Sequence, residues 1–282
     1  CGAEDIHYID LTGGTETGRK VAAQAGERLI RSTMELGGKT SMIICEDADF
    51  DGAIAGALFS AFVASGQTCV SGSRFIVHSS IYDRFTDALA VRADAIVIGD
   101  PMAEITQMGP VISKASQVRC LRMIGKAKAD GAVQIAGLTS PDLTAPFDKG
   151  FYIRPTIFKD VQSDHELFLE EVFGPVISMT PYTTEAEALE LANTGNFGLG
   201  LSIWSRDIAR AHRLSLGVRG GVVWLNDHHR NDPRSVWGGV RDSGFGKENG
   251  WDALKAYTTK KSVVVRTAPG YDDWFAGSTR YG

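Results

Sequence analysis

The 282-residue sequence has few cysteines, no excess of basic residues and no long apolar run. Its four cysteines, at positions 1, 45, 69 and 120, match no zinc-binding spacing and are too few for a disulfide framework. Lysine and arginine number 29 against 34 acidic residues, so the net charge is -5 and no basic stripe indicates a nucleic-acid partner. Glycine or charge interrupts every apolar run, so no membrane span is predicted. We expect a reducing, cytoplasmic compartment.

The first residues lack the basic-then-apolar pattern of a signal peptide. The chain starts at Cys1 rather than at methionine, so we expect it to begin inside a longer gene product. With 43% hydrophobic residues, it can form one large domain or two small ones.

Strand-like and helix-like segments alternate along the chain, which predicts an α/β fold. The predicted strands cover residues 6–11, 41–45, 75–78, 221–225 and 261–266. The predicted helices cover residues 19–32, a segment from Asp49 or Asp51 to about Ala64, and residues 81–93, 113–129, 186–193 and 208–216. Residues 137–150 are rich in Gly, Pro, Asp and Thr and predict a surface loop.

Cys69 is the first candidate for chemistry. Small residues and glycines surround it in the run Ser65-Gly66-Gln67-Thr68-Cys69, continued by Val-Ser-Gly-Ser. Such a loop lets backbone amides approach the sulfur, where they could hold an oxyanion. The reactive form is the thiolate, so we expect a local field that favours deprotonation. The alternative is a structural cysteine on a buried loop, as expected for Cys45 and Cys120.

Glu35 is the second candidate, in the run MELGGK at residues 34–39. Its apolar neighbours predict a raised carboxyl pKa, which suits a general base near neutral pH. The two following glycines indicate a tight backbone path beside another group. A glutamate at a helix end, followed by a glycine cap, is the alternative.

Two further segments could bind a cofactor. Residues 12–18 (TGGTETG) form a turn between a strand and a helix, where amide groups favour phosphate, although a plain βα turn fits equally. In residues 170–175 (EEVFGP), a carboxylate could accept a ribose hydroxyl and the aromatic ring could pack on a nicotinamide. The alternative is an acidic helix end with a core phenylalanine. His228 and His229 lie on one loop with no helical histidine pair, so no metal site is predicted.

These motifs occur together, in order, in one family. The sequence resembles the catalytic-domain half of the NAD(P)-dependent aldehyde dehydrogenase superfamily. Residues 34–39 resemble its glutamate signature, residues 66–69 its cysteine signature, residues 170–175 its cofactor-gripping motif and residues 12–18 the turn under the cofactor. The family's C-terminal sequence motifs have similar counterparts here in Asn226, residues 237–239 and residues 243–246. The resemblance covers residues 6 to about 266 and favours catalytic roles for Cys69 and Glu35.

The resemblance implies a fold. Residues 1–34 would be the last part of a Rossmann-like cofactor-binding domain, and residues 35–238 the aldehyde dehydrogenase-like catalytic domain. Residues 239–256 would return to the cofactor domain, and residues 257–282 would be an oligomerisation strand and tail. Residues 261–266 would pair with a neighbouring subunit, because an exposed β-branched strand is a natural edge for pairing between chains. A homodimer or homotetramer is expected.

The resemblance also implies a reaction, the oxidation of a small aldehyde to a carboxylic acid with NAD or NADP. The Cys69 thiolate would attack the carbonyl, and its backbone amide would help to hold the thiohemiacetal oxyanion. Hydride loss would leave a thioester, which water activated by Glu35 would hydrolyse. The implied cofactor-binding residues are Gly13, Gly14, Gly18, Leu36, Gly37, Glu171, which would hold the nicotinamide ribose, and Phe173. The implied substrate-pocket residues are Thr68, Val70, Asn226, His228, His229 and Trp237.

The sequence departs from the family in two respects. A full member has roughly one further domain before residue 1, which holds a lysine near the adenine ribose and an oxyanion-hole asparagine. Gly14 stands where many members have serine. We therefore expect this chain alone to bind cofactor poorly or not at all. Two other functions stay open: a catalytically silent assembly or binding module, and a CoA-acylating enzyme, against which Glu35 argues because hydrolysis needs a base.

Overall fold

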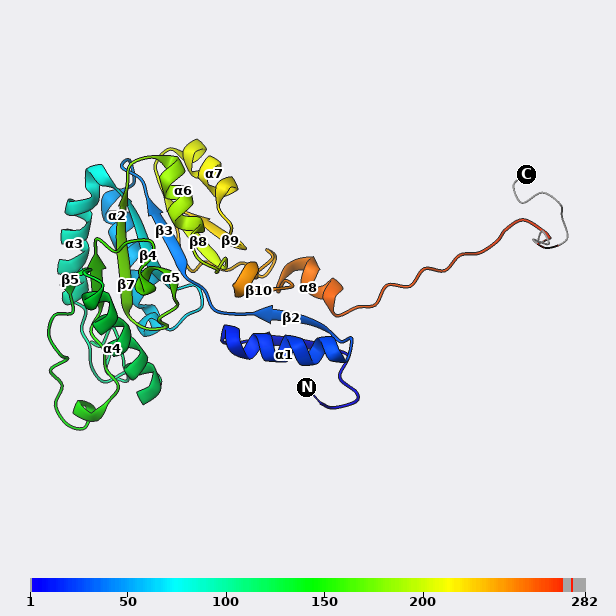
Figure 1. Cartoon of the computed structure of the whole chain (residues 1–282), viewed down its shortest axis with the longest axis horizontal. Helices are drawn as coiled ribbons and strands as arrows, with labels where there is room; N and C mark the ends of the chain where they lie inside the picture. Colours follow the sequence, from blue (N-terminus) through cyan, green and yellow to red (C-terminus); the bar gives the residue numbers. More distant parts are fainter. Residues whose placement is uncertain (1, 271–274, 276–282) are drawn as a thin grey trace.

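The computed structural model describes residues 2–270 and residue 275, which form two β-sheets flanked by helices (Figure 1). The larger sheet has seven strands in the order β5-β6-β7-β4-β3-β8-β9. Every neighbouring pair is parallel except β5 and β6, which are antiparallel. Its strands are β3 (Thr40–Ile44), β4 (Gly72–His78), β5 (Val133–Ala136), β6 (Thr156–Lys159), β7 (Val176–Tyr182), β8 (Gly200–Trp204) and β9 (Val222–Leu225).

Helices cover both faces of this sheet, because parallel strands need crossover connections. Along β3, Met42 and Ile44 pack with α2 and α3, whereas Ile43 and its neighbour Cys45 pack with α6 and α7. The large sheet is thus the middle layer of three. The helices are α2 (Phe50–Phe62), α3 (Tyr82–Asp94), α4 (Lys114–Ala129), α5 (Glu166–Leu169), α6 (Glu185–Asn193) and α7 (Ile208–Gly217).

The smaller sheet has three strands in the order β1-β2-β10. The strands β1 (Tyr8–Thr12) and β2 (Arg31–Glu35) are parallel and joined by α1 (Thr15–Glu27), and β10 (Gly244–Phe245) pairs antiparallel to β2. Helix α8 (Gly250–Ala256) follows β10. Figure 1 shows this sheet beside the larger one, joined to it where β2 leads into β3.

The predicted helix over residues 19–32 is wrong at both ends. Helix α1 starts at Thr15 and ends at Glu27, and Arg31–Glu35 is a strand. Leu29, within the predicted helix, is 93% exposed and adopts a left-handed φ of 56°. Val21, Ala25 and Leu29 are spaced as on one helix face, which favours a helix beyond Glu27, and β2 has little apolar alternation to indicate a strand. Glu35 therefore ends a strand and not a helix.

The predicted strand at residues 261–266 is not formed within the described chain. These residues belong to no strand, and Val263, Val264 and Val265 are 77%, 92% and 73% exposed. Figure 1 shows them leaving the body of the molecule as an extended segment after α8. Of the helices in the described residues, none combines the length and apolarity that crossing a membrane requires.

Candidate active site

The loop before Cys69 has an unusual backbone. Ala64, Ser65 and Gly66 adopt φ values of 51°, 58° and 69°, all in the left-handed region. Such a conformation is unfavourable for residues with a Cβ and persists only where the surroundings enforce it. Here the Ser65 hydroxyl donates to the Gly109 carbonyl oxygen at 2.9 Å. The loop is therefore held in one shape by contacts outside itself.

A tight turn then presents the cysteine. The Ser71 amide donates to the Thr68 carbonyl oxygen at 3.0 Å, so Cys69 lies inside a hydrogen-bonded turn just before β4. The Gln67 side chain ties the same loop to the segment before α4, because its Oε1 accepts from the Ile112 amide at 2.9 Å. Cys69 is half-buried, whereas Cys45 and Cys120 are buried.

Gly37 and Gly38 allow the backbone after Glu35, the cysteine loop and Glu171 to pack closely together. A Cβ at Gly38 would lie 2.7 Å from the Cys69 carbonyl oxygen, and a Cβ at Gly37 would collide with the Glu171 carboxylate. The Gly38 amide donates to Glu171 Oε1 at 3.0 Å. Because neither glycine carries a side chain, the backbone after Glu35 can pass directly between the cysteine loop and Glu171. The close approach inferred from the sequence is thus explained.

A cavity of about 550 Å³ opens on these groups. Its wall is formed by Glu35, Glu171, the cysteine loop and the turn before α1. The residues that line it are Thr12, Gly13, Gly14, Glu35, Leu36, Gly37, Cys69, Arg119, Glu171 and Phe173. The structure therefore gathers on one cavity the two predicted catalytic residues and most of the predicted cofactor-binding residues.

The Glu35 carboxyl group has the electrostatics of a base near neutral pH. Burial raises its pKa to about 7, and the negative charge of Glu248 acts in the same direction, whereas Lys247 lowers the pKa. Its Oε1 atom is buried and accepts no hydrogen bond from the described residues. A side chain at Gly238 would collide with this oxygen, so the glycine makes room for the carboxylate. The raised pKa expected from the sequence is present.

The Cys69 thiol does not have the field expected from the sequence. Burial raises its pKa, and the nearby carboxylates of Glu171 and Glu35 raise it further. The expectation of a field that favours the thiolate is therefore wrong. At neutral pH only a small fraction of Cys69 is in the reactive thiolate form.

We expect Cys69 to react with iodoacetamide before Cys45 and Cys120. Burial raises the pKa of all three thiols, so access decides the order; Cys45 and Cys120 are buried, whereas Cys69 is half-buried and lines the cavity. Timed labelling followed by peptide mapping measures the three rates. Earlier labelling of Cys45 or Cys120 would contradict the assignment of Cys69 as the accessible nucleophile.

The cavity has features that fit a nicotinamide cofactor. Gly14, at the N-cap of α1, provides no side-chain cap, so first-turn amides of this helix remain available for a phosphate group. The second carboxylate oxygen of Glu171 could accept a ribose hydroxyl. Phe173 adopts a left-handed φ of 53°, and Arg119 from α4 donates to the neighbouring Val172 carbonyl oxygen at 2.8 Å. Arg119 thus helps to hold the strained Phe173 at the cavity wall.

Comparison with known proteins agrees with this geometry. The model of the aldehyde dehydrogenase family matches residues 1–263. The chain belongs to the aldehyde dehydrogenase family. The betaine aldehyde dehydrogenases of Brucella anthropi and Brucella melitensis biotype 2 are each 42% identical to it over 257 residues. Each match covers 91% of this chain and 53% of the relative, so the chain spans about half the length of these curated relatives.

The fold is likewise that of solved aldehyde dehydrogenases. Crystal structures of betaine aldehyde dehydrogenase from Staphylococcus aureus in complex with NAD⁺ match with TM-scores of 0.94 and 0.93 at 36% identity. Each match covers 98% of this chain and 55% of the other. The predicted α/β, aldehyde dehydrogenase-like fold is confirmed.

The predicted substrate-pocket residues do not line the cavity of this aldehyde dehydrogenase chain. Val70 is buried with Leu199 and Trp224, and Trp237 packs against that cluster. Thr68 is half-buried, on the turn that presents Cys69. The sequence motif gave their order along the chain but not the direction in which each side chain points.

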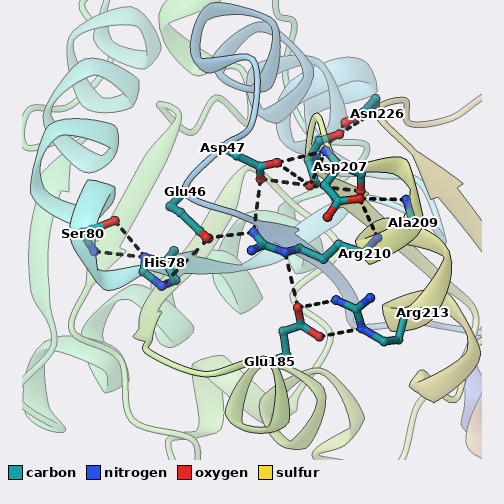
Figure 2. A network of polar contacts seen from close by, with 11 residues as sticks. Glu46, Asp47, His78, Ser80, Glu185, Asp207, Ala209, Arg210, Arg213 and Asn226 are labelled. Atoms are coloured by element: carbon teal, nitrogen blue, oxygen red, sulfur yellow. Dashed lines mark hydrogen bonds and ion pairs between the residues drawn. The ribbon is translucent and has the colours of Figure 1, made fainter.

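Asn226 stabilises a loop. Its Oδ1 accepts from the Ser205 amide and its Nδ2 donates to the Ser205 carbonyl oxygen, both at 2.9 Å. Figure 2 shows it at the edge of a polar network in which Asp47 binds the Ser205 hydroxyl and Arg210 binds Glu46 and Asp47. Asn226 is therefore a structural anchor, since both ends of its amide are occupied by backbone.

The two histidines differ in their surroundings. His228 is buried with both ring nitrogens within hydrogen-bond distance of protein oxygens. His229 is half-buried, with Nε2 3.2 Å from the Ser60 carbonyl oxygen and its ring 5.3 Å from that of the exposed Phe59. Gly18 lies on α1 against Leu36 and does not line the main cavity.

Sequence reasoning assigned no separate role to two residues near the cavity. Arg119 lines it, and Lys39 is buried close to Glu171. Burial and the adjacent Arg74 guanidinium lower the pKa of Lys39 to about 7, while Glu171 acts in the opposite direction. Lys39 was within the signature that drew attention to Glu35, but a lysine in a run of sequence gives no sign of burial. Arg119 lies on a helix with no distinctive motif.

Proposed function

We propose that this chain supplies the nucleophile and the general base of an NAD(P)-dependent aldehyde dehydrogenase. The observation that carries the proposal is the single cavity on which Cys69, Glu35 and Glu171 meet. Cys69 attacks the aldehyde carbonyl, and its backbone amide stabilises the oxyanion that forms. Glu35, with a pKa of about 7, then takes a proton from the water that hydrolyses the thioester.

NAD is the cofactor we propose, since the structural relatives from Staphylococcus aureus were solved in complex with NAD⁺. When bound, it would accept the hydride from the thiohemiacetal carbon. On this chain, Gly13, Gly14 and the first turn of α1 would receive its diphosphate, and Glu171 its nicotinamide ribose. Phe173 and Leu36 would exclude water from the ring.

The position and pKa of Glu35 favour hydrolysis over transfer of the acyl group to CoA. Water is a much weaker nucleophile than a thiolate and depends on a general base, and Glu35 lines the same cavity as Cys69. Betaine aldehyde is the first substrate to test, because the most similar relatives reported above carry that name. A cytoplasmic location stays a prediction.

The domain division inferred from the sequence enters the proposal as well. The sheet β1-β2-β10 would belong to the cofactor domain, and the seven-stranded sheet to the catalytic domain. We propose that residues 261–266 pair with another subunit, since three consecutive valines there are exposed and have no strand partner in the described chain. Such pairing would hold the enzyme as a homo-oligomer.

Incubation of the 282-residue chain with p-nitrophenyl acetate tests the proposal. We expect slow release of p-nitrophenol and an acetyl group on the peptide that contains Cys69. With one oxyanion donor fewer than a complete site, the rate should be about 10²–10³-fold below that of a full enzyme. Reduction of NAD with betaine aldehyde should be negligible, because the small sheet offers few groups to hold the cofactor.

Acetylation at other residues only would contradict the role of Cys69. Normal NAD-dependent oxidation by a preparation shown by mass spectrometry to contain only these residues would contradict the expected weak cofactor binding. A chain that neither releases p-nitrophenol nor carries an acetyl group would favour the alternative of a silent assembly module.

A further inference from the structure

The loop that carries His228 is fixed at both ends. Asn226, with a left-handed φ of 53°, is bound to the Ser205 backbone by two hydrogen bonds. At the other end, Trp224 Nε1 donates to the Arg230 carbonyl oxygen at 2.7 Å. The Trp224 ring also lies 4.8 Å from that of His228. The loop therefore holds the His228 ring in one place beneath the cysteine turn.

The hydrogen bonds of His228 place a proton on Nε2. Its Nε2 lies 2.8 Å from the Val70 carbonyl oxygen, which can only accept, so Nε2 carries the hydrogen. Its Nδ1 then accepts from the Ser202 hydroxyl at 3.2 Å, and that oxygen accepts from Trp204 Nε1 at 3.3 Å. Burial lowers the pKa of His228 to about 4, so the ring is neutral near pH 7 and Nδ1 acts as the acceptor.

The carbonyl that His228 binds belongs to the residue after the nucleophile. Cys69 and Val70 are the two central residues of the turn closed by the bond from Ser71 to Thr68. Rotation of this turn would move both the Cys69 amide and the sulfur. A buried donor fixed to the Val70 carbonyl prevents that rotation, since breaking the bond would leave two buried polar groups without partners.

We propose that His228 is a positioning residue, which orients the Cys69 turn through the Val70 carbonyl so that the Cys69 amide points at the developing oxyanion. In this role it acts through the Cys69 turn and not by contact with substrate or cofactor. The inference rests on the proposed function, because it concerns the nucleophile of that reaction. It also gives His228 a different part from the one implied by family resemblance, which placed it in the substrate pocket.

Two reactions of the same thiol test the proposal in the 282-residue chain. Acylation by p-nitrophenyl acetate needs the aligned amide, whereas alkylation by iodoacetamide forms no oxyanion and needs only an accessible thiolate. We expect His228→Met to slow acylation by about 10²-fold, the usual effect of misplacing a reacting group. Alkylation should stay near the wild-type rate. His228→Gln, which keeps an amide donor near the position of Nε2, should restore most of the acylation rate.

His78→Met is the matched control, since His78 lies at the far end of β4 and contacts Ser80 and the Tyr182 ring. Ser202→Ala provides a second variant if His228→Met fails to melt cooperatively. Loss of the hydrogen bond from the Ser202 hydroxyl to His228 Nδ1 should slow acylation by about fivefold. Three outcomes would each overturn the proposal. The rates of acylation and alkylation could fall in parallel, or acylation could be unchanged in both His228→Met and Ser202→Ala. His228→Gln could also fail to restore the acylation rate. Absence of acylation at Cys69 in the wild type would instead refute the proposed function itself.

Discussion

Replacing Cys69 with alanine is expected to abolish hydrolysis of p-nitrophenyl acetate by this chain. Loss of a nucleophile costs roughly 10⁶-fold in a complete hydrolase, and a missing oxyanion donor already removes about 10²–10³-fold of the rate. The expected loss is therefore about 10³–10⁴-fold, measured as initial rates of p-nitrophenol release above the uncatalysed background.

Cys120→Ala is the matched control for Cys69→Ala. Cys120 is also a free thiol, but it is fully buried between α4 and the Gly174 turn, and it does not line the cavity. Its replacement should leave the hydrolytic rate unchanged once the fraction of folded protein is matched. Equal activity of Cys69→Ala and the wild type would assign the hydrolysis to another group.

Glu35→Gln should separate the two halves of the reaction. Acylation of Cys69 should continue, but the thioester should accumulate because loss of a general base costs about 10²–10⁴-fold. Stopped-flow measurements would then show a burst of p-nitrophenol followed by a much slower steady rate. Mass spectrometry should find acetyl-Cys69 at near-stoichiometric occupancy during the slow phase.

The pH dependence of deacylation identifies the base. Glu35 can accept a proton only when its carboxyl group is ionised, and burial raises the pKa of that group to about 7. In the wild type, the deacylation rate should therefore rise with pH below about 7 and level off above it, whereas the Glu35→Gln rate should lack this inflection. Because the charge of Glu248 raises the Glu35 pKa, Glu248→Gln should move the inflection to lower pH. A wild-type turnover rate in Glu35→Gln would exclude Glu35 as the base.

The candidate site was largely predictable because its chemistry lies in short runs of sequence. Cys69 and Glu35 each stand beside glycines that serve close packing, and both the glycines and the reactive groups are visible as residue types. Arg119 was missed, and the contacts of His228 were not foreseen, because both depend on the direction in which the side chain points. Neither the carbonyls that Arg119 binds nor the burial of the His228 ring leaves a pattern in the sequence.

The fold was predictable where apolar residues recur at a regular helical or strand spacing, and it was poorly predictable elsewhere. Helix α4 matched its predicted limits closely, since Ser113 caps it and Asp130 follows its last turn. Four strands of the large sheet, β5 to β8, received no assignment from the sequence. Buried parallel strands do not alternate between polar and apolar residues, so they lack the period-two signal that identifies a half-exposed strand. In β2 the alternation was likewise weak, and a helix was predicted across its start.

The proposed nucleophile and base belong to different sheets. Cys69 precedes β4 of the seven-stranded sheet, whereas Glu35 ends β2 of the three-stranded sheet, paired with Thr12 and Gly244. Only residues 36–39 connect β2 to β3. Under the proposed roles, acylation depends on the seven-stranded sheet, and release of the product acid depends also on how the three-stranded sheet is joined to it. Anything that clamps or loosens this joint would then set the lifetime of the acyl-enzyme without altering how fast it forms.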